Sequence, residues 1–362
     1  MKSSLENARK KINSIDKEMA KLFEERMRCV EAVAEYKKER GLAILDQARE
    51  DELIKKNSEL VEDEVIREYY INFLKNNMAV SRAYQERLIS GMKVAFAGTE
   101  GAFAHIAANK LFPTANKIAF SDFKSAYRAV ESGECDVCVL PLENSYNGEV
   151  GQVTDLMFSG TLYVNGMMEL AVDQDLLGLP DAKLEDIKKV LSHPQALGQC
   201  RDYIREREFE AEEYSNTALA AKRVGELGDR SIAAIASGEA AELFGLKVLD
   251  KNINETRSNT TRFAVFSRVP NKTKSSDSGV HSVLLFTVRN EAGSLARAID
   301  VIGKCGFNMR TLRSRPMKEL LWEYYFYVEA EGNIQTEAGQ SMLEELSEFC
   351  DKLKFVGTYV KL

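Results

Sequence analysis

A short polar group at the start of an apolar run has residue types that could do chemistry. The segment NTTRF places a hydroxyl and a guanidinium, Thr261 and Arg262, just before AVF. A threonine hydroxyl can donate a hydrogen bond to a leaving group, and an arginine can bind a carboxylate through two parallel hydrogen bonds. Thr261 is equally compatible with an ordinary β-branched residue that begins a strand. The rest of the sequence has to decide between these two interpretations.

Three more polar clusters border apolar runs in the same part of the chain. They are GTEGAFAHIAA (98–108), PLENSYNGEV (141–150) and SHPQALGQC (192–200). In an α/β sheet such segments gather at the carboxyl ends of the strands, where ligands usually bind. A single Gly-x-x-Gly turn or His-Pro pair is more typical of an ordinary turn. The clusters together predict a ligand site.

Cations near the N-terminus are spaced to hold an anion. Arg26 and Lys37 are eleven residues apart, which is close to three helical turns and roughly 16 Å, so both project from one helix face. Together they could hold a dianion. Arg9 lies about 25 Å from Arg26 along such a helix, so we expect it to serve the site of a partner subunit.

Polar residues also share a face on two later helical stretches. Asp46, Arg49 and Glu50 occur at i, i+3 and i+4, and Ser81 and Gln85 occur at i and i+4. From spacing alone, these residues fit a solvated helical bundle with surface ion pairs better than a site.

The elements that must position the cations are helices. Up to about residue 90 the apolar residues recur every three to five positions, and no strand pattern interrupts them. The sequence predicts three helices in an all-α domain, residues 1–91, whose core is completed by dimerisation. The apolar residues of the first helix are Leu5, Ala8, Ile12, Ile15, Met19, Leu22, Met27 and Val30.

After residue 91 the pattern changes twice. Residues 92–270 alternate short apolar runs with helical stretches, which predicts an α/β domain with a largely parallel sheet. The polar stretch 271–279 has the composition of a linker. Residues 280–362 predict the order β-α-β-β-α-β, an α+β ferredoxin-like pattern.

Composition limits the class of protein. The 362 residues suggest two or three domains, and 44% hydrophobic with 29% charged residues describe an ordered globular chain. A net charge of -7 argues against general nucleic-acid binding but allows a local anion site. The N-terminus MKSSLENARKK lacks the apolar core of a secretory signal, and no apolar run would span a membrane. We expect a cytoplasmic protein.

The cysteines give no sign of a metal or disulfide framework. Six are scattered along the chain, and it holds only three histidines. Cys135 and Cys138 form a lone CxxC in a strand-like run, where they would point to opposite faces. We expect plain buried thiols and no cofactor.

The helical segment resembles the all-helical class of chorismate mutase in the order and spacing of its polar residues. The resemblance implies a pericyclic rearrangement of chorismate to prephenate that needs only a folded substrate and charge stabilisation. It implies that Arg26 and the partner subunit's Arg9 hold the carboxylates and that Lys37 and Gln85 donate to the ether oxygen. It also implies that Glu50 accepts a hydrogen bond from the substrate hydroxyl. The other binding residues implied are Asp46, Arg49 and Ser81.

The four polar clusters resemble those of prephenate dehydratase, in that family's order. The resemblance implies a two-lobed domain similar to periplasmic binding proteins, with Thr261 as the catalytic residue. The substrate-binding residues implied are Glu143, Asn144, Ser145, His193, Gln195, Arg262 and Phe263. Thr99, Ala104 and Glu255 stand where the family usually has proline, a hydroxyl residue and aspartate.

The C-terminal segment resembles the ACT domain that binds phenylalanine in this family. Its loop contains Gly293, Ser294 and Leu295, where Gly-Ala-Leu is usual. A second segment contains Arg313, Ser314, Arg315 and Pro316, with Arg313 where glutamate is usual. The resemblance implies an effector site for L-phenylalanine between two such modules. A dimerisation module without a ligand is the alternative.

The whole chain thus resembles the bifunctional chorismate mutase and prephenate dehydratase of phenylalanine biosynthesis. The resemblance implies chorismate and prephenate as substrates, feedback regulation by L-phenylalanine and a homo-oligomer that is at least a dimer. Two alternatives remain open from the sequence. The mutase could be fused to an arogenate dehydratase, or to a binding-protein-like sensor without turnover.

Overall fold

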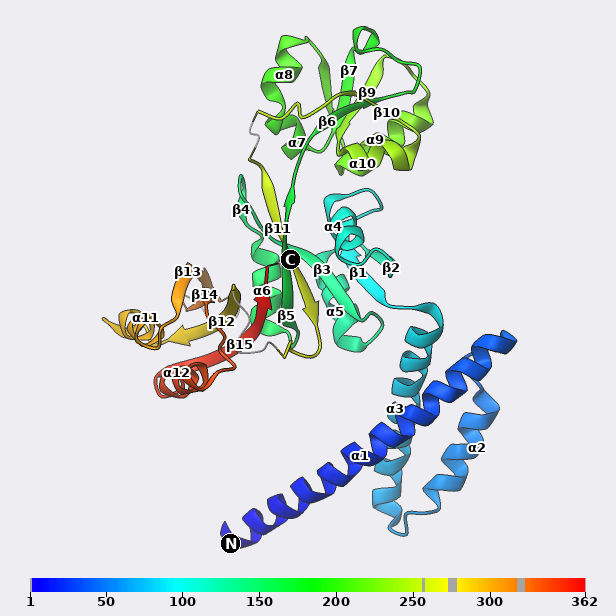
Figure 1. Ribbon diagram of the computed structural model, residues 1–362, viewed down its shortest axis with the longest axis vertical. Coiled ribbons are helices and arrows are strands. Elements are labelled where there is room, and N and C mark those ends of the chain that lie inside the picture. The colour runs from blue at the N-terminus through cyan, green and yellow to red at the C-terminus, as the bar shows by residue number, and fades with distance from the viewer. Residues whose placement is uncertain (1, 256–257, 273–278, 318–322, 362) are drawn as a thin grey trace. The chain divides into compact units, whose positions relative to one another are not determined.

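The chain divides into two compact units, Met1–Met92 and Lys93–Leu362. The computed structural model describes residues 2–255, 258–272, 279–317 and 323–361 (Figure 1). Residues 273–278 of the predicted linker lie outside these ranges.

The first unit consists of three helices, as the sequence predicts. Their bounds are α1 (Lys2–Arg40), α2 (Gln47–Ser58) and α3 (Glu64–Ser90). Asp46 caps α2 by accepting from the Arg49 backbone N–H, and Asp63 caps α3 in the same way. These carboxylates satisfy amide groups that have no partner inside the helix.

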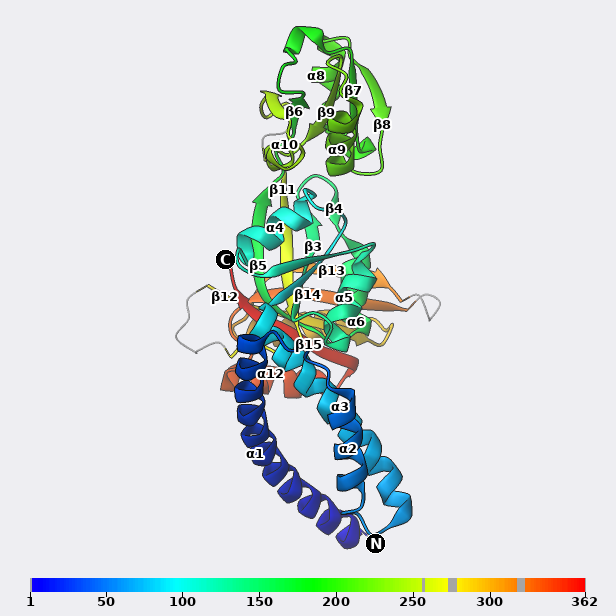
Figure 2. The ribbon, with the colours of Figure 1, turned by 90° about the vertical axis from the view of Figure 1, so that its right-hand side faces the viewer.

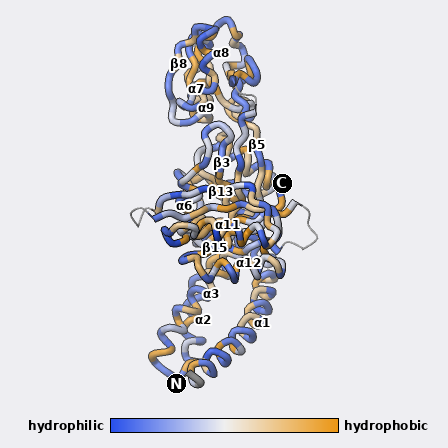
Figure 3. Tube along the Cα trace, turned by 90° about the vertical axis from the view of Figure 1, so that its left-hand side faces the viewer, coloured by the Kyte–Doolittle hydropathy of each residue, from blue (hydrophilic) through white to orange (hydrophobic). Residues whose placement is uncertain are grey.

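This helical unit buries little apolar surface within one chain. Val30, Ala34 and Met78 are its buried hydrophobic residues among those described. Hydrophobic and hydrophilic stretches alternate along the length of α1 (Figure 3). The large apolar residues that α1 leaves exposed include Leu5, Ile12, Ile15, Met19, Leu22 and Phe23.

The second unit begins with a lobe built on a six-stranded sheet of order β2-β1-β3-β11-β5, with β4 paired to β3. Its strands are β1 (Lys93–Ala97), β2 (Asn116–Phe120), β3 (Val137–Asn144), β4 (Gly148–Glu149), β5 (Tyr163–Ala171) and β11 (Thr260–Ser267). Its helices are α4 (Phe103–Leu111), α5 (Phe123–Ser132) and α6 (Gly151–Ser159).

A second lobe carries a five-stranded sheet of order β10-β6-β9-β7-β8. The strands are β6 (Asp175–Gly178), β7 (Lys189–Ser192), β8 (Glu210–Glu213), β9 (Ile232–Ala236) and β10 (Lys247–Asp250). The helices are α7 (Pro194–Gln199), α8 (Arg201–Glu206), α9 (Thr217–Leu227) and α10 (Gly238–Phe244), together with the 3₁₀ turn η1 (Leu184–Asp186).

The prediction of a largely parallel sheet is wrong. The described strands of the two lobes make four parallel pairings and five antiparallel ones. The chain passes from β5 into the second lobe and returns through β11, so β11 runs against both of its neighbours (Figure 2). The sheets are therefore mixed.

The C-terminal part of the second unit has the element order that the sequence predicts. Its strands are β12 (Val280–Val288), β13 (Asn308–Pro316), β14 (Tyr324–Glu331) and β15 (Cys350–Val360), and its helices are α11 (Ser294–Lys304) and α12 (Glu337–Ser347). The sheet has the order β13-β14-β12-β15, and every pairing in it is antiparallel.

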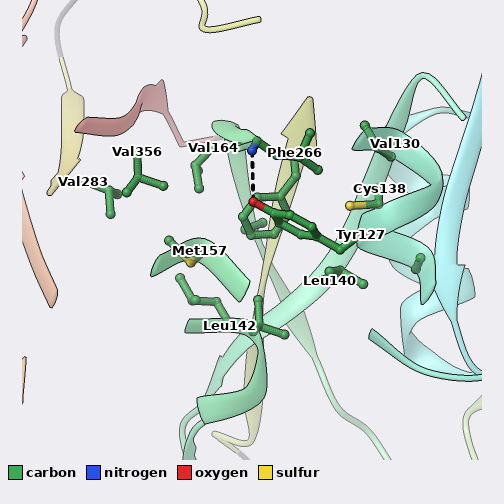
Figure 4. Packing of buried hydrophobic residues seen from close by; sticks show 14 of the residues in the cluster. Tyr127, Val130, Cys138, Leu140, Leu142, Met157, Val164, Phe266, Val283 and Val356 are labelled. Carbon is green, nitrogen blue, oxygen red and sulfur yellow. Dashed lines mark hydrogen bonds between the residues drawn. The ribbon is translucent and has the colours of Figure 1, made fainter. Parts of the chain in front are cut away.

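One core joins this C-terminal part to the first lobe. Val283 and Val356 belong to the same buried cluster as Val164 and Phe266 (Figure 4). At Gly357 a Cβ atom would collide with the backbone oxygen of Val164, so only glycine allows this close approach. Lys93–Leu362 is accordingly one compact unit.

Cys135 and Cys138 are buried free thiols, as predicted, and burial raises the pKa of Cys135 to about 11. In the described ranges, no helix combines the length and the apolar character needed to cross a membrane.

Candidate active sites

Two polar residues of α3 and one cation of α1 meet inside the helical unit. The Arg26 guanidinium donates to Ser81 Oγ, and Gln85 Nε2 donates to the Ser81 carbonyl at 3.4 Å. Ser81 and Gln85 are 5% and 7% exposed. Gln85 Oε1 is buried without a hydrogen-bond partner among the described residues. A cation and an amide therefore converge where α1 crosses α3.

The other predicted mutase residues have separate contacts in a single chain. Lys37 donates to the Ile44 carbonyl. Asp46 accepts from the Arg49 backbone N–H at 3.0 Å, and the Arg49 side chain pairs with Glu52 at 2.8 Å in an exposed position. Among the described contacts, none joins these residues to Arg26.

Glu50 has a partner that the sequence did not suggest. Both of its carboxylate oxygens accept hydrogen bonds from the guanidinium of Arg82 on α3. The side chains of Glu50 and Arg82 are 19% and 33% exposed. Arg82 was missed because the pairing depends on how α2 packs against α3, which the spacing within either helix does not reveal.

Thr261, the predicted catalytic residue, begins β11 and forms a hydrogen bond across the sheet. It pairs with Asn144 at the end of β3, and Asn144 Nδ2 donates to Thr261 Oγ1 at 2.9 Å. The same amide donates to Asn259 Oδ1 at 2.8 Å. Asn144 Oδ1 accepts from the backbone N–H groups of Tyr146 and Asn147 at 3.0 and 2.9 Å. These contacts fix which end of the Asn144 amide faces Thr261.

This arrangement determines the role of the Thr261 hydroxyl. An amide –NH₂ can only donate, so Thr261 Oγ1 accepts from Asn144 and keeps its own hydrogen for another acceptor. Thr261 is 8% exposed and Asn144 is 9% exposed. The hydroxyl is thus oriented as a hydrogen-bond donor in a nearly dry environment.

The neighbouring predicted residues have structural contacts. Ser145 Oγ accepts from the Thr260 backbone N–H at 2.9 Å and donates to the Ser258 carbonyl at 3.0 Å, which ties the end of β3 to the start of β11. His193 caps α7 and accepts from the Gln195 backbone N–H at 3.3 Å. The Gln195 side chain is exposed.

Buried amides close to Asn144 form a feature that the sequence did not single out. Gln199 and Asn259 are 6% and 4% exposed. Within the described part of the chain, Gln199 Nε2 and Asn259 Nδ2 have no hydrogen-bond partner. Both residues line a small cavity with Tyr146, Asn254 and Glu255. This cavity, of about 10 Å³, thus brings two unpaired amide donors and the Glu255 carboxylate together, and Asn259 links it to Asn144 and Thr261.

Arg262 and Glu143 face away from Thr261, although both were expected to bind substrate. Successive residues of a strand point to opposite faces, and Arg262 pairs with Glu143 in the register of β11 and β3. Arg262 contacts Glu143 at 3.4 Å and Glu329 of the C-terminal part at 2.8 Å. Phe263 is 2% exposed and is buried within the sheet.

A wide cleft of the second unit does not suit a dianion. It has a volume of about 490 Å³, and its charged side chains are four carboxylates and two lysines. Burial raises the pKa of Asp175, one of these carboxylates. The charged residues of this cleft are Lys110, Asp173, Asp175, Glu239, Glu242 and Lys251.

The predicted effector residues fall into two groups. Gly293 has a positive φ of 88° and caps α11, which begins at Ser294, and Leu295 packs against the C-terminal core. On β13, Ser314 and Pro316 are exposed. Arg313 and Arg315 instead contact carboxylates of the first lobe, namely Glu143, Glu149 and Asp155.

Two family models match separate parts of this chain. Residues 8–86 match the family model "Chorismate mutase type II" and residues 94–271 match "Prephenate dehydratase". The bifunctional chorismate mutase/prephenate dehydratase of Neisseria gonorrhoeae is 32% identical over 361 residues, which cover 97% of this chain and 95% of the relative. This chain belongs to the bifunctional chorismate mutase/prephenate dehydratase family.

Other relatives match about three quarters of this chain. Arogenate dehydratase/prephenate dehydratase 2 of Arabidopsis thaliana is 32% identical over 279 residues, 75% of this chain and 73% of the relative. The solved structure of GqqA, named a quorum-quenching acylase, has a TM-score of 0.69 and 31% identity and covers 75% of this chain and 98% of its own. The solved structure of prephenate dehydratase of Arthrobacter aurescens in complex with L-Phe has a TM-score of 0.68 and 25% identity. The match covers 74% of this chain and 90% of that chain.

Proposed function

We propose that this chain converts chorismate to prephenate in its helical unit and prephenate to phenylpyruvate in its two-lobed unit, two successive steps of phenylalanine biosynthesis. The proposed domains are residues 1–91, 92–270 and 280–362. The observation that carries the second activity is the hydrogen bond from Asn144 Nδ2 to Thr261 Oγ1, which leaves the threonine hydrogen free to donate.

The dehydratase step needs little more than such a donor. Prephenate loses its ring carboxylate as carbon dioxide, and the electrons of that carbon–carbon bond enter the ring as the carbon–oxygen bond to the hydroxyl breaks. The hydroxyl leaves as water with one proton. Thr261 donates a hydrogen bond to the departing oxygen, and the aromatic ring that forms supplies the driving force. Solvent supplies the net proton.

The buried amides are the proposed receptors for the substrate's charge. Gln199 Nε2 and Asn259 Nδ2 are unpaired donors in the described residues, and Asn259 is already bonded to Asn144. A carboxylate that accepts from both would satisfy two donors whose burial is otherwise costly, and to admit it the cavity of about 10 Å³ must widen and the Glu255 carboxylate must turn away. His193, Gln195 and Ser145 belong to the segments that hold these residues in place.

The mutase step requires positioning and charge stabilisation only. Arg26 and the partner subunit's Arg9 bind the two carboxylates, and Ser81 orients Arg26. Lys37 and Gln85 donate to the ether oxygen, which gains negative charge as its bond breaks. Glu50 accepts from the substrate hydroxyl, while Asp46 and Arg49 complete the site from the start of α2.

A second copy of the chain is the proposed cover for α1. The exposed apolar residues of α1 include Leu5, Ile12 and Met19, and the apolar spacings of three and four residues are those of a coiled-coil seam. Arg9 lies on this helix about 25 Å from Arg26, so it reaches a mutase site only in a neighbouring chain. The proposed assembly is at least a homodimer.

L-phenylalanine is the proposed effector, bound by the C-terminal part, which has the strand and helix order of a ferredoxin-like ACT domain. The solved relative from Arthrobacter aurescens is in complex with L-Phe. Gly293, Ser294 and Leu295 at the start of α11 offer backbone groups for an amino acid, and Ser314 and Pro316 leave an exposed face of β13. Inhibition corresponds to a coupling on the order of 1 to 3 kcal/mol.

Three alternative functions make different predictions. An arogenate dehydratase would turn over arogenate faster than prephenate, and a sensor would bind prephenate without turnover. An acylase needs an activated nucleophile, commonly a serine or cysteine beside a histidine. None of the three histidines has a serine, threonine or cysteine side chain as a hydrogen-bond partner among the described contacts, so the similarity to GqqA stays a similarity of fold and sequence.

The direct experiment supplies the purified chain with each substrate alone. We expect chorismate to be consumed and prephenate to yield phenylpyruvate, detected by its absorbance in alkali, with prephenate preferred over arogenate. Asn144→Asp is the sharper variant because its carboxylate would accept the Thr261 hydrogen and withdraw it from the substrate. Dehydratase activity at the wild-type rate in Asn144→Asp would refute the proposed role of Thr261 as an oriented donor.

A further inference from the structure

The residues next to Thr261 and Asn144 form a second polar cluster on the opposite face of the sheet. Thr261 is paired with Asn144, and the next residues on the two strands, Arg262 and Glu143, are paired with each other. Because side chains alternate between the faces, one face of this two-strand segment carries the proposed chemistry, and the other faces the C-terminal part. The register then shifts at Phe263.

Arg262 is held by a buried carboxylate of the C-terminal part. Its Nη2 donates to Glu329 Oε1 at 2.8 Å and contacts the Tyr359 hydroxyl at 3.0 Å, and its Nη1 donates to Glu143 at 3.4 Å. The side chain of Arg262 is 17% exposed and that of Glu329 is 2% exposed. Arg262 therefore joins a strand of the first lobe to β14.

Both members of this pair are charged. Burial lowers the pKa of Arg262. The hydrogen bond with Glu329 and the charge of that carboxylate raise the pKa by more, so the net shift is upward. Burial also opposes ionisation of Glu329, yet Arg262 and the Tyr359 hydroxyl hold the pKa of that carboxyl below its usual range. A buried pair of this kind is strongly sensitive to loss of either partner, because the other charge is then left uncompensated.

A second arginine of the C-terminal part extends the cluster. Arg313 of β13 donates to Glu143 Oε1, while Arg262 donates to Glu143 Oε2. Glu143 is thus held between two arginines, and it immediately precedes Asn144. Arg313 also lies over the Tyr327 ring, with its guanidinium carbon 5.9 Å from the ring centroid.

We propose that Arg262, Glu329 and Arg313 are positioning residues of the dehydratase: they fix the strand segment that presents Thr261 and Asn144, and so make its geometry depend on the C-terminal part. This inference rests on the proposed dehydratase function. None of the three touches the substrate. A state of the C-terminal part that draws Glu329 or Arg313 away would loosen the Asn144–Thr261 hydrogen bond and slow the reaction.

Substitutions in the full chain test the proposal. In Glu329→Gln the charge is lost while the side-chain size is kept, and we expect the dehydratase kcat to fall on the order of 10- to 100-fold, because small misplacements of reacting groups have such costs. KM for prephenate should change less than kcat. Arg313→Met should give a smaller fall in kcat, because Glu143 keeps its contact with Arg262. Mutase activity, from a separate unit, should stay unchanged in each variant.

A matched control separates positioning from general attachment. Lys361 pairs with Glu169 at 3.2 Å, also between the C-terminal part and the first lobe, but both side chains are more than half exposed. Lys361→Met should leave kcat and KM at wild-type values. The same substitutions should reduce the fold inhibition by added L-phenylalanine, whereas Lys361→Met should not.

The outcomes are distinguishable. If wild type dehydrates prephenate and Glu329→Gln and Arg313→Met keep its kcat while melting at lower temperature, the cluster only stabilises the fold and the inference is wrong. If Glu329→Gln fails to fold, Arg313→Met alone decides, and an unchanged kcat in that variant overturns the proposal. A wild-type chain without dehydratase activity would instead refute the proposed function, and this inference with it.

Discussion

The two catalytic regions of this molecule differ in how much of each site one chain supplies. In the two-lobed unit, Thr261 and Asn144 are buried and already hydrogen-bonded to each other. In the helical unit, Arg26 meets Ser81, but Arg9 is exposed on the same helix, which buries little of its apolar face. From this difference we propose that the dehydratase site is organised within a chain and the mutase site by association.

Removing the Thr261 hydroxyl should have the largest effect on activity, and only on that of the dehydratase. Thr261→Ala leaves the departing oxygen without its donor, and positioned donors contribute about 10²- to 10⁴-fold to rate. We expect a dehydratase kcat lower by that factor, measured as phenylpyruvate formed from prephenate. Thr261→Ser keeps a hydroxyl and should retain part of the rate, and mutase activity reports that the chain is folded. Comparable rates in Thr261→Ala and wild type would show that Thr261 only begins a strand.

Replacing Gln85 by a carboxylic acid should make the mutase dependent on acidic pH. The Gln85 amide donates at every pH, whereas a carboxyl group donates only when protonated. Gln85→Glu should therefore lose mutase activity as the pH rises through the pKa of the introduced group, which its burial would raise. The check is a pH profile of chorismate consumption, with the dehydratase profile of the same chain as reference. A flat profile at the wild-type rate would remove Gln85 from the site.

Arg82 should have a moderate effect on the mutase alone. Arg82→Ala leaves Glu50 without the guanidinium that holds both of its oxygens, and a hydrogen bond to a charged group is worth about 1.5–3 kcal/mol. We expect kcat/KM for chorismate to fall roughly tenfold, since tenfold corresponds to about 1.4 kcal/mol. Arg28→Ala, which breaks an exposed ion pair with Glu24 on the same unit, is the control and should change little. Equal effects of the two variants would mean that Arg82 does not position Glu50.

The smallest expected effect is on stability in acid. Glu329 faces Arg262, Tyr327, Tyr359 and His281, the last with its pKa lowered by burial. Because the folded-state pKa of Glu329 is lowered, its stabilisation is present above the unfolded pKa of about 4.3 and is lost as the pH falls through the folded value. The difference in free energy of unfolding between wild type and Glu329→Gln should shrink below about pH 4.3 in chemical denaturation. A constant difference from pH 7 to pH 3 would contradict the lowered pKa.

The sequence predicts the elements well where burial leaves a periodic pattern. The three long helices and strands such as β1, β3, β9 and β11 follow from it. Strand β8, EAEE, was missed because all four of its residues are exposed and it lies at a sheet edge, so no apolar alternation marks it. The direction of β11 was also missed, since the chain's return from the second lobe is a property of topology rather than of local pattern.

The sequence predicts which residue types belong to the candidate sites, but not the direction in which each side chain points. Within GQC and HPQ, Gln199 is buried with an unpaired donor while Gln195 is exposed, and only the packing of α7 distinguishes them. Arg262 has the residue type of a carboxylate ligand, but strand alternation directs it toward Glu329. Arg313 likewise contacts Glu143 across the sheet instead of an exposed face.

The most direct test of this account mixes two inactive mutases. Arg9→Ala and Arg26→Ala chains, each inactive alone, are combined under conditions where subunits demonstrably exchange, and both activities are measured before and after mixing. We predict that part of the mutase activity returns, because some mixed dimers contain one site with both arginines, while the dehydratase activity of each chain is at wild-type level throughout. No recovery of mutase activity despite exchange would contradict the shared site and, with it, the division between a site organised by association and a site organised within one chain.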